Sequence, residues 1–217
     1  MARSVRDISR SVVGPGYGRR VSVIVRPAVV GDAAELHALS EEAILRSAAS
    51  HYTEPQLRAW AGRRSVEGHV RMIERTAAFV AAEEGRAVGF ATVALAPGRG
   101  LLAGEVDQLF VRPDSSGRGV ARLLLSALER AARDAGLMDL VTHASWRAVP
   151  LFERHGFVQM EVETVSIGDQ QLTRAFMRKP LVTAGQRDGS LDTYSHLPVG
   201  VGREAAERAA ALSRGAP

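Results

Sequence analysis

The chain contains no cysteine and only one lysine, Lys179, among its 217 residues. The absence of cysteine excludes disulfides and thiolate metal sites, and it permits a reducing compartment. No apolar run approaches the roughly 20 residues that span a bilayer. The arginine-containing N-terminus also lacks the apolar segment of a signal peptide. We therefore expect a cytoplasmic protein that does not enter a membrane.

The pI of about 10.2 would suit a nucleic-acid-binding protein, but the excess positive charge is confined to one end. Residues 1–20 hold five arginines and one aspartate, a net charge of +4, which equals that of the whole chain. Residues 21–217 are therefore neutral overall, which argues against nucleic-acid binding by the folded part. Nucleic-acid binding by the arginine-rich N-terminal segment is retained as an alternative.

Sequence patterns divide the chain into three parts. Residues 1–20 include the breaker-rich stretch GPGYGRR, which predicts a disordered basic tail. Residues 21–182 are predicted to form one domain with its own apolar core. Residues 183–217 are predicted to form a C-terminal tail, in which the alanine-rich stretch 201–214 is a candidate helix.

Within the predicted domain, strand and helix patterns follow one another without an internal repeat. Two-residue alternation and β-branched runs indicate strands, and apolar residues at helical spacing indicate helices. The predicted order is β-α-α-β-β-β-α-β-α-β-β, which places the chain in the α/β (α+β) class. The predicted strands are 21–27, two within 76–96 joined by a turn at 84–86, 104–113, 137–145, 157–167 and 172–181. The predicted helices are 31–48, a second region within 51–75, 119–136 and 147–156. In the second region a loop leads into a short helix within 51–61, with Thr53 or Glu54 near its start and Pro55 in its first turn, and the helical pattern continues through 65–75.

Two glycines, Gly117 and Gly119, stand directly before the most regular helix pattern, in the stretch RPDSSGRGVARLLL. The first N–H groups of a helix lack partners inside it, and the helix dipole is positive there. Glycine allows those N–H groups to approach an anion closely, so this stretch predicts a phosphate-binding loop. The alternative is a tight strand-to-helix turn that binds no ligand.

Neither common phosphate motif fits this loop. A P-loop needs Lys-Ser/Thr after its last glycine, and none follows Gly119. The dinucleotide fingerprint needs a third glycine where this chain has Arg122. The loop is therefore either another class of anion site or a tight strand-to-helix turn that binds no ligand.

The segment VDQLFVRPDSSGRGVARLLLSALE, followed by LFERHGF, resembles the GNAT superfamily of acyl-CoA-dependent N-acyltransferases. Members carry [Q/R]-x-x-G-x-[G/A] at the start of a helix and a Gly-Phe after a later short helix. Here the first motif reads SGRGVA, so Ser116 replaces the usual Gln or Arg. The resemblance spans residues 22–182. It implies a mixed, mostly antiparallel twisted sheet of six or seven strands with four flanking helices.

A looser resemblance links the chain to one branch of that superfamily. The stretches HYTEPQLRAWA, AVPLFERHGF and GDQQLTRAFMRKPL are similar to those of uncharacterised bacterial acetyltransferases. This second resemblance identifies no substrate.

The superfamily resemblance implies acetyl-CoA as co-substrate and a primary amine of a small molecule or a protein as acceptor. The pyrophosphate would bind the loop N–H groups, with Arg118 or Arg122 as a further partner. The pantetheine arm would pair with the edge of the preceding strand, and a hydroxyl replaces a common Asn at Ser145. The implied cofactor contacts are Leu109, Phe110, Val111, Gly117, Arg118, Gly119, Val120, Ala121, Arg122, Ser145 and Phe152.

Two acids are candidates for the base that removes a proton from the amine. Strand alternation predicts that Glu105, Asp107 and Leu109 share one face. Many GNAT members have a catalytic Glu at the position of Glu105, and the related branch often has an acid at Asp107. The alternative for each is a solvated carboxylate at a strand end, and the sequence does not separate the two acids.

The superfamily often protonates the leaving thiolate with a Tyr, but this chain has Phe152 at that position. Tyr52, Ser145 and His143 are the candidate replacements, and Tyr52 is also a candidate substrate contact. Ordinary packing is the alternative for Tyr52. No His, Asp or Glu spacing indicates a metal site.

The acceptor-side residues leave the substrate open. Trp60 and Trp146 could line an acceptor pocket, although packing is the alternative for both. Glu41, Glu42 and Glu54 would suit a cationic amine. The edge of the last strand and the 201–214 helix are candidate homodimer surfaces. A non-catalytic acyl-CoA sensor or regulatory module is the alternative function, because Phe152 cannot donate a proton.

Overall fold

The computed structural model describes residues 22–181, so the predicted tails and the 201–214 helix lie outside the described residues. The described part forms a seven-stranded sheet in the order β1-β2-β3-β4-β5-β7-β6. Neighbouring strands are antiparallel except β4 and β5, which run parallel. This confirms the predicted class and mixed sheet. The strands are β1 (Ile24–Pro27), β2 (Ala77–Glu83), β3 (Arg86–Val93), β4 (Glu105–Val111), β5 (Asp139–Ser145), β6 (Val158–Ile167) and β7 (Gln170–Pro180).

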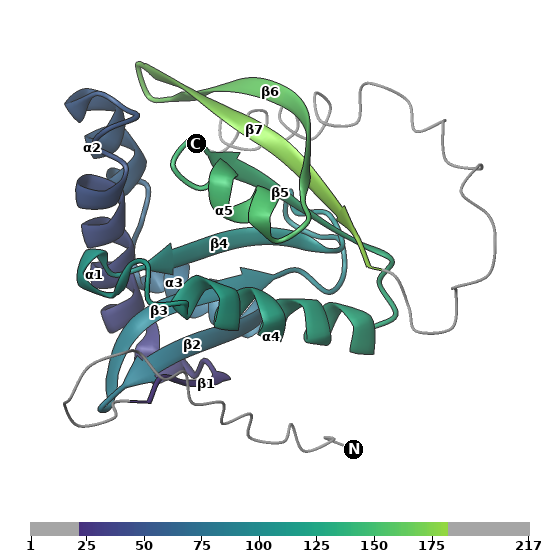
Figure 1. Ribbon diagram of the computed structural model, residues 1–217. Helices are drawn as coiled ribbons and strands as arrows, with labels where there is room; N and C mark the ends of the chain where they lie inside the picture. Colours follow the sequence, from purple (N-terminus) through teal and green to yellow (C-terminus); the bar gives the residue numbers. More distant parts are fainter. Residues whose placement is uncertain (1–21, 182–217) are drawn as a thin grey trace, which may run out of the picture.

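Helices cover both faces of this sheet (Figure 1). Helix α4 and the short α5 pack on one face, where Leu124, Leu128 and Phe152 belong to the same core cluster. Helices α1 and α3 pack on the opposite face around Phe90, and α2 lies against the β7 strand. The helices are α1 (Ala33–Glu42), α2 (Glu54–Gly62), α3 (Val66–Arg75), α4 (Val120–Asp134) and α5 (Val149–Arg154). None of the helices within 22–181 is long and apolar enough to cross a membrane.

The prediction of four helices was wrong, because the second helical region is divided into α2 and α3. Helix α2 begins as predicted, with Thr53 as its N-cap and Pro55 in its first turn. It ends at Gly62, and Ser65 starts a new helix by accepting the Gly68 N–H at 3.0 Å. A serine cap satisfies one of the N–H groups that a helix start leaves free, so it favours a break here.

The predicted hairpin between β2 and β3 is confirmed at Glu84 and Gly85. Both residues have positive φ, +50° and +82° respectively. Positive φ at both central residues is typical of the type I′ turn, whose twist matches that of the flanking strands.

Helix α1 does not end where its regular pattern ends but continues as a π-helical turn over Ala43–Ser47. This turn was not predicted, since one inserted residue leaves no clear mark on helical spacing. It buries Ile44 and leads into the loop that places Tyr52 in a core cluster with α2 and the β6–β7 hairpin.

Candidate active site

Both glycines of the loop between β4 and α4 adopt left-handed backbone. φ is +78° at Gly117 and +83° at Gly119, which is the N-cap of α4. A Cβ built on either residue would meet no described atom within 4 Å. Backbone conformation, not crowding, therefore requires glycine here, and the space beside the loop is open.

The N–H groups of this loop point to an anion site. Within the described part of the chain, the backbone N–H groups of residues 117–122 have no hydrogen-bond acceptor. The first helical bond of this region is donated by the Leu123 N–H to the Gly119 carbonyl, at 3.1 Å. Helix α4 has 15 residues, and its positive dipole end lies at the same N–H groups.

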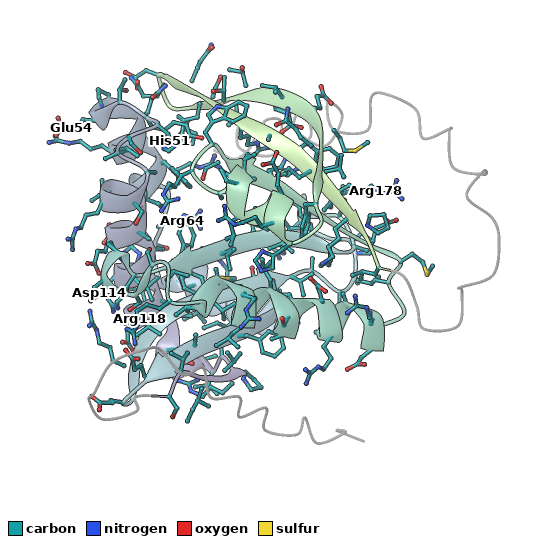
Figure 2. The ribbon with its side chains drawn as sticks, viewed as in Figure 1. His51, Glu54, Arg64, Asp114, Arg118 and Arg178 are labelled. Carbon is teal, nitrogen blue, oxygen red and sulfur yellow. The ribbon has the colours of Figure 1, made fainter. Side chains whose placement is uncertain are left out.

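The two loop arginines differ in their freedom to bind an anion. The Arg118 guanidinium pairs with Glu83 on β2, with one N–O distance of 3.0 Å. Arg122 is exposed and makes no ion pair within residues 22–181. The exposed Asp114 and Arg118 lie by the turn that precedes α4 (Figure 2). Arg122 is therefore the freer of the two predicted cations.

Strands β4 and β5 pair only at their beginnings. Their parallel register joins Glu105 to Val141 and Val106 to Thr142, and no later pair is formed. The Arg112 N–H donates to the Val88 carbonyl on β3 at 2.9 Å. With the two-residue period of a strand, the N–H and C=O groups of Leu109 and Val111 face away from β3, toward the unpaired side. An extended ligand could pair with that edge.

A β-bulge in β4 overturns the predicted alternation. Val93 pairs with Val106 and Thr92 pairs with Gln108, which leaves Asp107 as the extra residue. Leu109 consequently packs with Val106 in the core under α4. The prediction that Glu105, Asp107 and Leu109 share one face was wrong, because the extra residue shifts the alternation by one position.

Glu105 is the most buried acid of this region, with 6% of its surface exposed. Its Oε2 accepts the Leu102 N–H at 2.8 Å. Its Oε1 lies 3.9 Å from His143 Nε2 on β5. Burial raises the pKa of Glu105 above its ordinary value, the Leu102 hydrogen bond opposes this, and the nearby charge of Asp107 adds to it. A carboxylate in this setting holds a proton more readily than a solvated glutamate does.

Beyond Glu105, a chain of polar side chains crosses β5, β7 and β6. His143 Nδ1 lies 2.8 Å from Glu163 Oε2, which also accepts the Arg174 Nε–H at 3.0 Å. With Nδ1 donating to Glu163, Nε2 is left as the acceptor nitrogen that faces Glu105. Burial, followed by the charge of Arg174, lowers the pKa of His143 and so favours the neutral imidazole, while the carboxylate of Glu163 opposes this shift.

Similarity to known proteins identifies the family to which this chain belongs. A family model described as an acetyltransferase (GNAT) domain matches residues 48–172, more than half of the chain. The chain belongs to the GNAT acetyltransferase family. It is also 29% identical over 148 residues to the uncharacterised N-acetyltransferase YafP of Escherichia coli K12, covering 68% of this chain and 89% of that protein. The GNAT domain and these N-acetyltransferase relatives make this chain an acyltransferase.

Solved structures agree with the GNAT assignment. A GCN5-related N-acetyltransferase of Rhodopseudomonas palustris is 30% identical, with a TM-score of 0.67, and covers 76% of this chain and 100% of its own. The PaiA N-acetyltransferase of Thermoplasma acidophilum, solved with coenzyme A, is 16% identical with a TM-score of 0.61. That comparison covers 73% of this chain and 99% of PaiA, which shares the GNAT fold.

Tyr52 holds three parts of the GNAT domain together. Its hydroxyl donates to the Thr173 carbonyl on β7 at 2.9 Å and accepts the Trp146 N–H at 3.0 Å. Its ring meets Trp60 of α2 edge-on, at 5.9 Å between centroids. Burial raises the pKa of Tyr52, and its proton is already engaged by a carbonyl. This placement favours a structural role over that of a proton donor.

Replacing Tyr52 with phenylalanine is expected to lower the unfolding free energy by about 1–3 kcal/mol, since the Trp146 N–H loses its acceptor. Equilibrium denaturation measures this loss. When the rate is corrected for the fraction of protein that is folded, kcat for acetylation should change little. A large fall in kcat with unchanged stability would instead make Tyr52 a proton donor.

The other predicted thiolate-side residues lie on the opposite side of β5 or at its end. Phe152 is 3% exposed and packs edge-on against Phe157 at 5.0 Å, inside the core under α4. Ser145 ends β5, and its carbonyl accepts the Ala148 N–H at 2.7 Å. Phe152 therefore presents almost none of its surface to a cofactor.

The acids predicted on the acceptor side are already paired. Glu42 binds Arg112 at 2.7 Å and Arg46 at 2.8 Å. The exposed Glu54 pairs with Arg58, and Glu41 lies 3.7 Å from His37. These three acids therefore do not gather as a free acidic lining.

Three residues that the sequence did not predict, Arg64, Glu163 and Arg174, lie on the same face of the sheet as Asp107 and Glu105. Glu163 and Arg174 sit opposite each other on β6 and β7. Only the pairing register of two distant strands, β5 and β7, brings them to His143. No group of three His, Asp or Glu side chains within residues 22–181 is arranged to hold a metal.

Proposed function

We propose that the protein is an N-acetyltransferase that moves the acetyl group of acetyl-CoA to a primary amine. The observation that carries this proposal is the buried Glu105 in the short paired segment after which β4 and β5 separate, with the open glycine loop at the other end of β4. Two fold neighbours, PaiA and YncA of Salmonella typhimurium, were solved with coenzyme A and acetyl-CoA respectively.

The cofactor would bind along β4. The free N–H groups of residues 117–122 suit the pyrophosphate, with Arg122 as a further cation and Arg118 available if it leaves Glu83. The outward backbone groups of Leu109 and Val111 suit the pantetheine amides, as in the addition of a strand. Phe110 points its ring to the other side, where it contacts α2 and α3 residues.

Glu105 is the better candidate base of the two acids. The amine nitrogen attacks the thioester carbon, the carbon–sulfur bond breaks, and the nitrogen loses a proton to the carboxylate directly or through water. A base works best when its pKa lies near the operating pH, and burial moves the pKa of Glu105 in that direction. Asp107 is exposed, and its role would be to attract the ammonium form of the acceptor.

His143 would serve as a positioning residue, through the Nε2 that faces Glu105. The sulfur leaves as a thiolate or takes a proton from solvent, since Phe152 has none to give. A non-catalytic acyl-CoA sensor remains the second candidate function, and Phe152 is the feature that favours it.

Acetyl transfer to a mixed panel of primary amines separates the two functions. The purified protein is incubated with acetyl-CoA and the amines, and acetylated products are identified by mass spectrometry together with CoA release. We expect at least one acetylated amine that forms only with the protein. Tight binding of acetyl-CoA with no product from any amine would identify a sensor.

Three further expectations remain predictions: a cytoplasmic location, a homodimer, and the absence of nucleic-acid binding. The N-terminal arginines and the 201–214 segment on which two of them depend lie outside the described residues. The prediction that the last strand offers a free edge for a homodimer was wrong, because β7 pairs with β5 on one side and with β6 on the other.

A further inference from the structure

Arg64 lies between α2 and the sheet, beside the proposed site (Figure 2). It follows the C-cap of α2, and its guanidinium carbon sits over the Phe110 ring at 5.1 Å from the centroid. Phe110 belongs to β4, three residues after the bulged Asp107. A flat guanidinium stacked on an aromatic ring keeps its N–H edges free to bind a planar anion.

Those N–H edges have no partner in the part of the chain that the structure describes. No hydrogen bond or ion pair of the Arg64 guanidinium is present there, although Asp107 is close enough to attract it. Burial lowers the pKa of Arg64, because a charge held away from water is destabilised, and the nearby Asp107 opposes this shift. Other partly buried arginines are paired with acids: Arg26 with Asp32, Arg112 with Glu42, Arg174 with Glu163, and Arg178 with Asp139.

Polar atoms on the same face also lack partners within residues 22–181. They are His69 Nε2, Thr92 Oγ1 and Gln108 Oε1, all buried. Thr92 and Gln108 face each other across β3 and β4, next to Asp107. His69 Nδ1 lies 2.8 Å from the Ser65 carbonyl, so its Nε2 is an acceptor. Buried polar atoms are normally satisfied, so this face is built to meet a polar ligand or water.

The site thus presents separate charges of both signs. Asp107 and Glu105 attract a cation at the bulge of β4, and Arg64 attracts an anion above Phe110. Asp107 interacts electrostatically with Arg64 but does not form an ion pair with it within 4.0 Å. A ligand with an ammonium group and a carboxylate would complement both ends.

We propose that the acceptor is a primary amine that also carries a carboxylate, of which free amino acids are the simplest case. Its carboxylate binds the Arg64 guanidinium, while its amino group lies at Glu105 and Asp107. This inference rests on the proposed N-acetyltransferase function and specifies its substrate class. The acetyl transfer step is the one described above, and Arg64 acts on binding alone.

The test measures kcat/KM for matched sets of amines with acetyl-CoA. Each set holds an amino acid, its amide and its decarboxylated amine, and O-phosphoethanolamine beside ethanolamine probes phosphate in place of carboxylate. The variant is Arg64→Met, which keeps an apolar stem on Phe110. The control is Arg63→Met, which removes the same charge from the exposed neighbouring residue.

We expect the wild-type protein to prefer the amino acid in each set. In Arg64→Met, loss of a charge-assisted hydrogen-bonded pair should raise KM for amino acids roughly 10- to 100-fold. The kcat/KM for the amides and the decarboxylated amines, which lack a carboxylate, should not fall, and Arg63→Met should behave as wild type. Thermal stability of Arg64→Met should equal or exceed that of wild type, because an unpaired charge is removed.

Several results would overturn the inference while leaving the proposed function standing. One is a wild-type kcat/KM that is higher for the amides, the decarboxylated amines or the phosphorylated amine than for the amino acids. Another is an equal fall in kcat/KM for all amines in Arg64→Met. A fall in stability with unchanged selectivity would assign Arg64 to packing on Phe110. Absence of product from every amine would overturn both the substrate class and the proposed function.

Discussion

Replacing Glu105 with glutamine is expected to lower kcat by about 10²- to 10⁴-fold, the usual contribution of a general base. Glutamine has nearly the same shape and can still accept the Leu102 N–H, so the backbone there should not change. Acetyl-CoA affinity, measured by isothermal titration, should stay at its wild-type value. Loss of turnover with retained cofactor binding would place the effect in the chemical step.

The pH dependence of kcat/KM gives a second readout of the same residue. The base acts in its deprotonated form, so activity falls as pH drops through the pKa of Glu105. Because burial raises that pKa, the acidic limb should lie above the ordinary glutamate value of 4.5. The limb should disappear in Glu105→Gln if that carboxylate is the base.

The raised pKa of Glu105 affects stability in the direction opposite to activity: activity falls as pH drops, whereas the contribution to stability falls as pH rises. A carboxyl group with a raised pKa in the folded state binds its proton more tightly folded than unfolded. Its stabilising contribution is complete below the unfolded pKa and is lost as pH rises through the folded pKa. At neutral pH, Glu105→Gln should therefore unfold at a temperature equal to or above that of wild type.

Asp107→Asn is the matched control for Glu105→Gln. Asp107 is the exposed, bulged residue, so its replacement should act mainly on KM for the amine. A larger fall in kcat in Asp107→Asn than in Glu105→Gln would contradict the assignment and make Asp107 the base.

Replacing Gly119 with glutamate is expected to weaken acetyl-CoA binding about 100-fold or more, since like charges placed together cost several kcal/mol. The new carboxylate would stand at the N-cap of α4, beside the N–H groups proposed to hold the pyrophosphate. Isothermal titration with acetyl-CoA and with CoA measures the loss. Equal losses for both ligands would locate the effect at the pyrophosphate and not at the acetyl group.

Gly85→Glu controls for backbone strain in this experiment. Gly85 has a φ of +82°, against +83° at Gly119, and a Cβ at either residue meets no described atom within 4 Å. Any side chain in left-handed backbone costs about 1–2 kcal/mol, so both variants should lose similar stability. Only Gly119→Glu should lose acetyl-CoA. Similar affinities in both variants would contradict a pyrophosphate site at the loop.

The sequence predicted most of the fold because its elements carry local signals. Glycine next to Glu84 predicted the β2–β3 turn, and Pro55 with Thr53 predicted the start of α2. Such signals act through φ preferences and capping within a few residues. The break before Ser65 was local too, but a helical pattern continues on both sides of it and conceals the cap.

The parts of the site that the sequence did not predict depend on contacts between distant residues. The bulge at Asp107 is defined by the β3 register and not by β4 alone, so simple alternation placed Leu109 on the wrong face. Glu163 meets His143 only because β7 inserts between β5 and β6. In the sequence, Arg64 has the pattern of a surface arginine after a helix, and only the tertiary structure places it over the Phe110 ring.

A crystal structure of the protein with acetyl-CoA tests the central claim most directly. The account predicts the pyrophosphate on the N–H groups of residues 117–122, pantetheine amides hydrogen-bonded to Leu109 and Val111, and the thioester beside Glu105. A thioester far from Glu105, or a pantetheine arm that does not enter the space between β4 and β5, would contradict it.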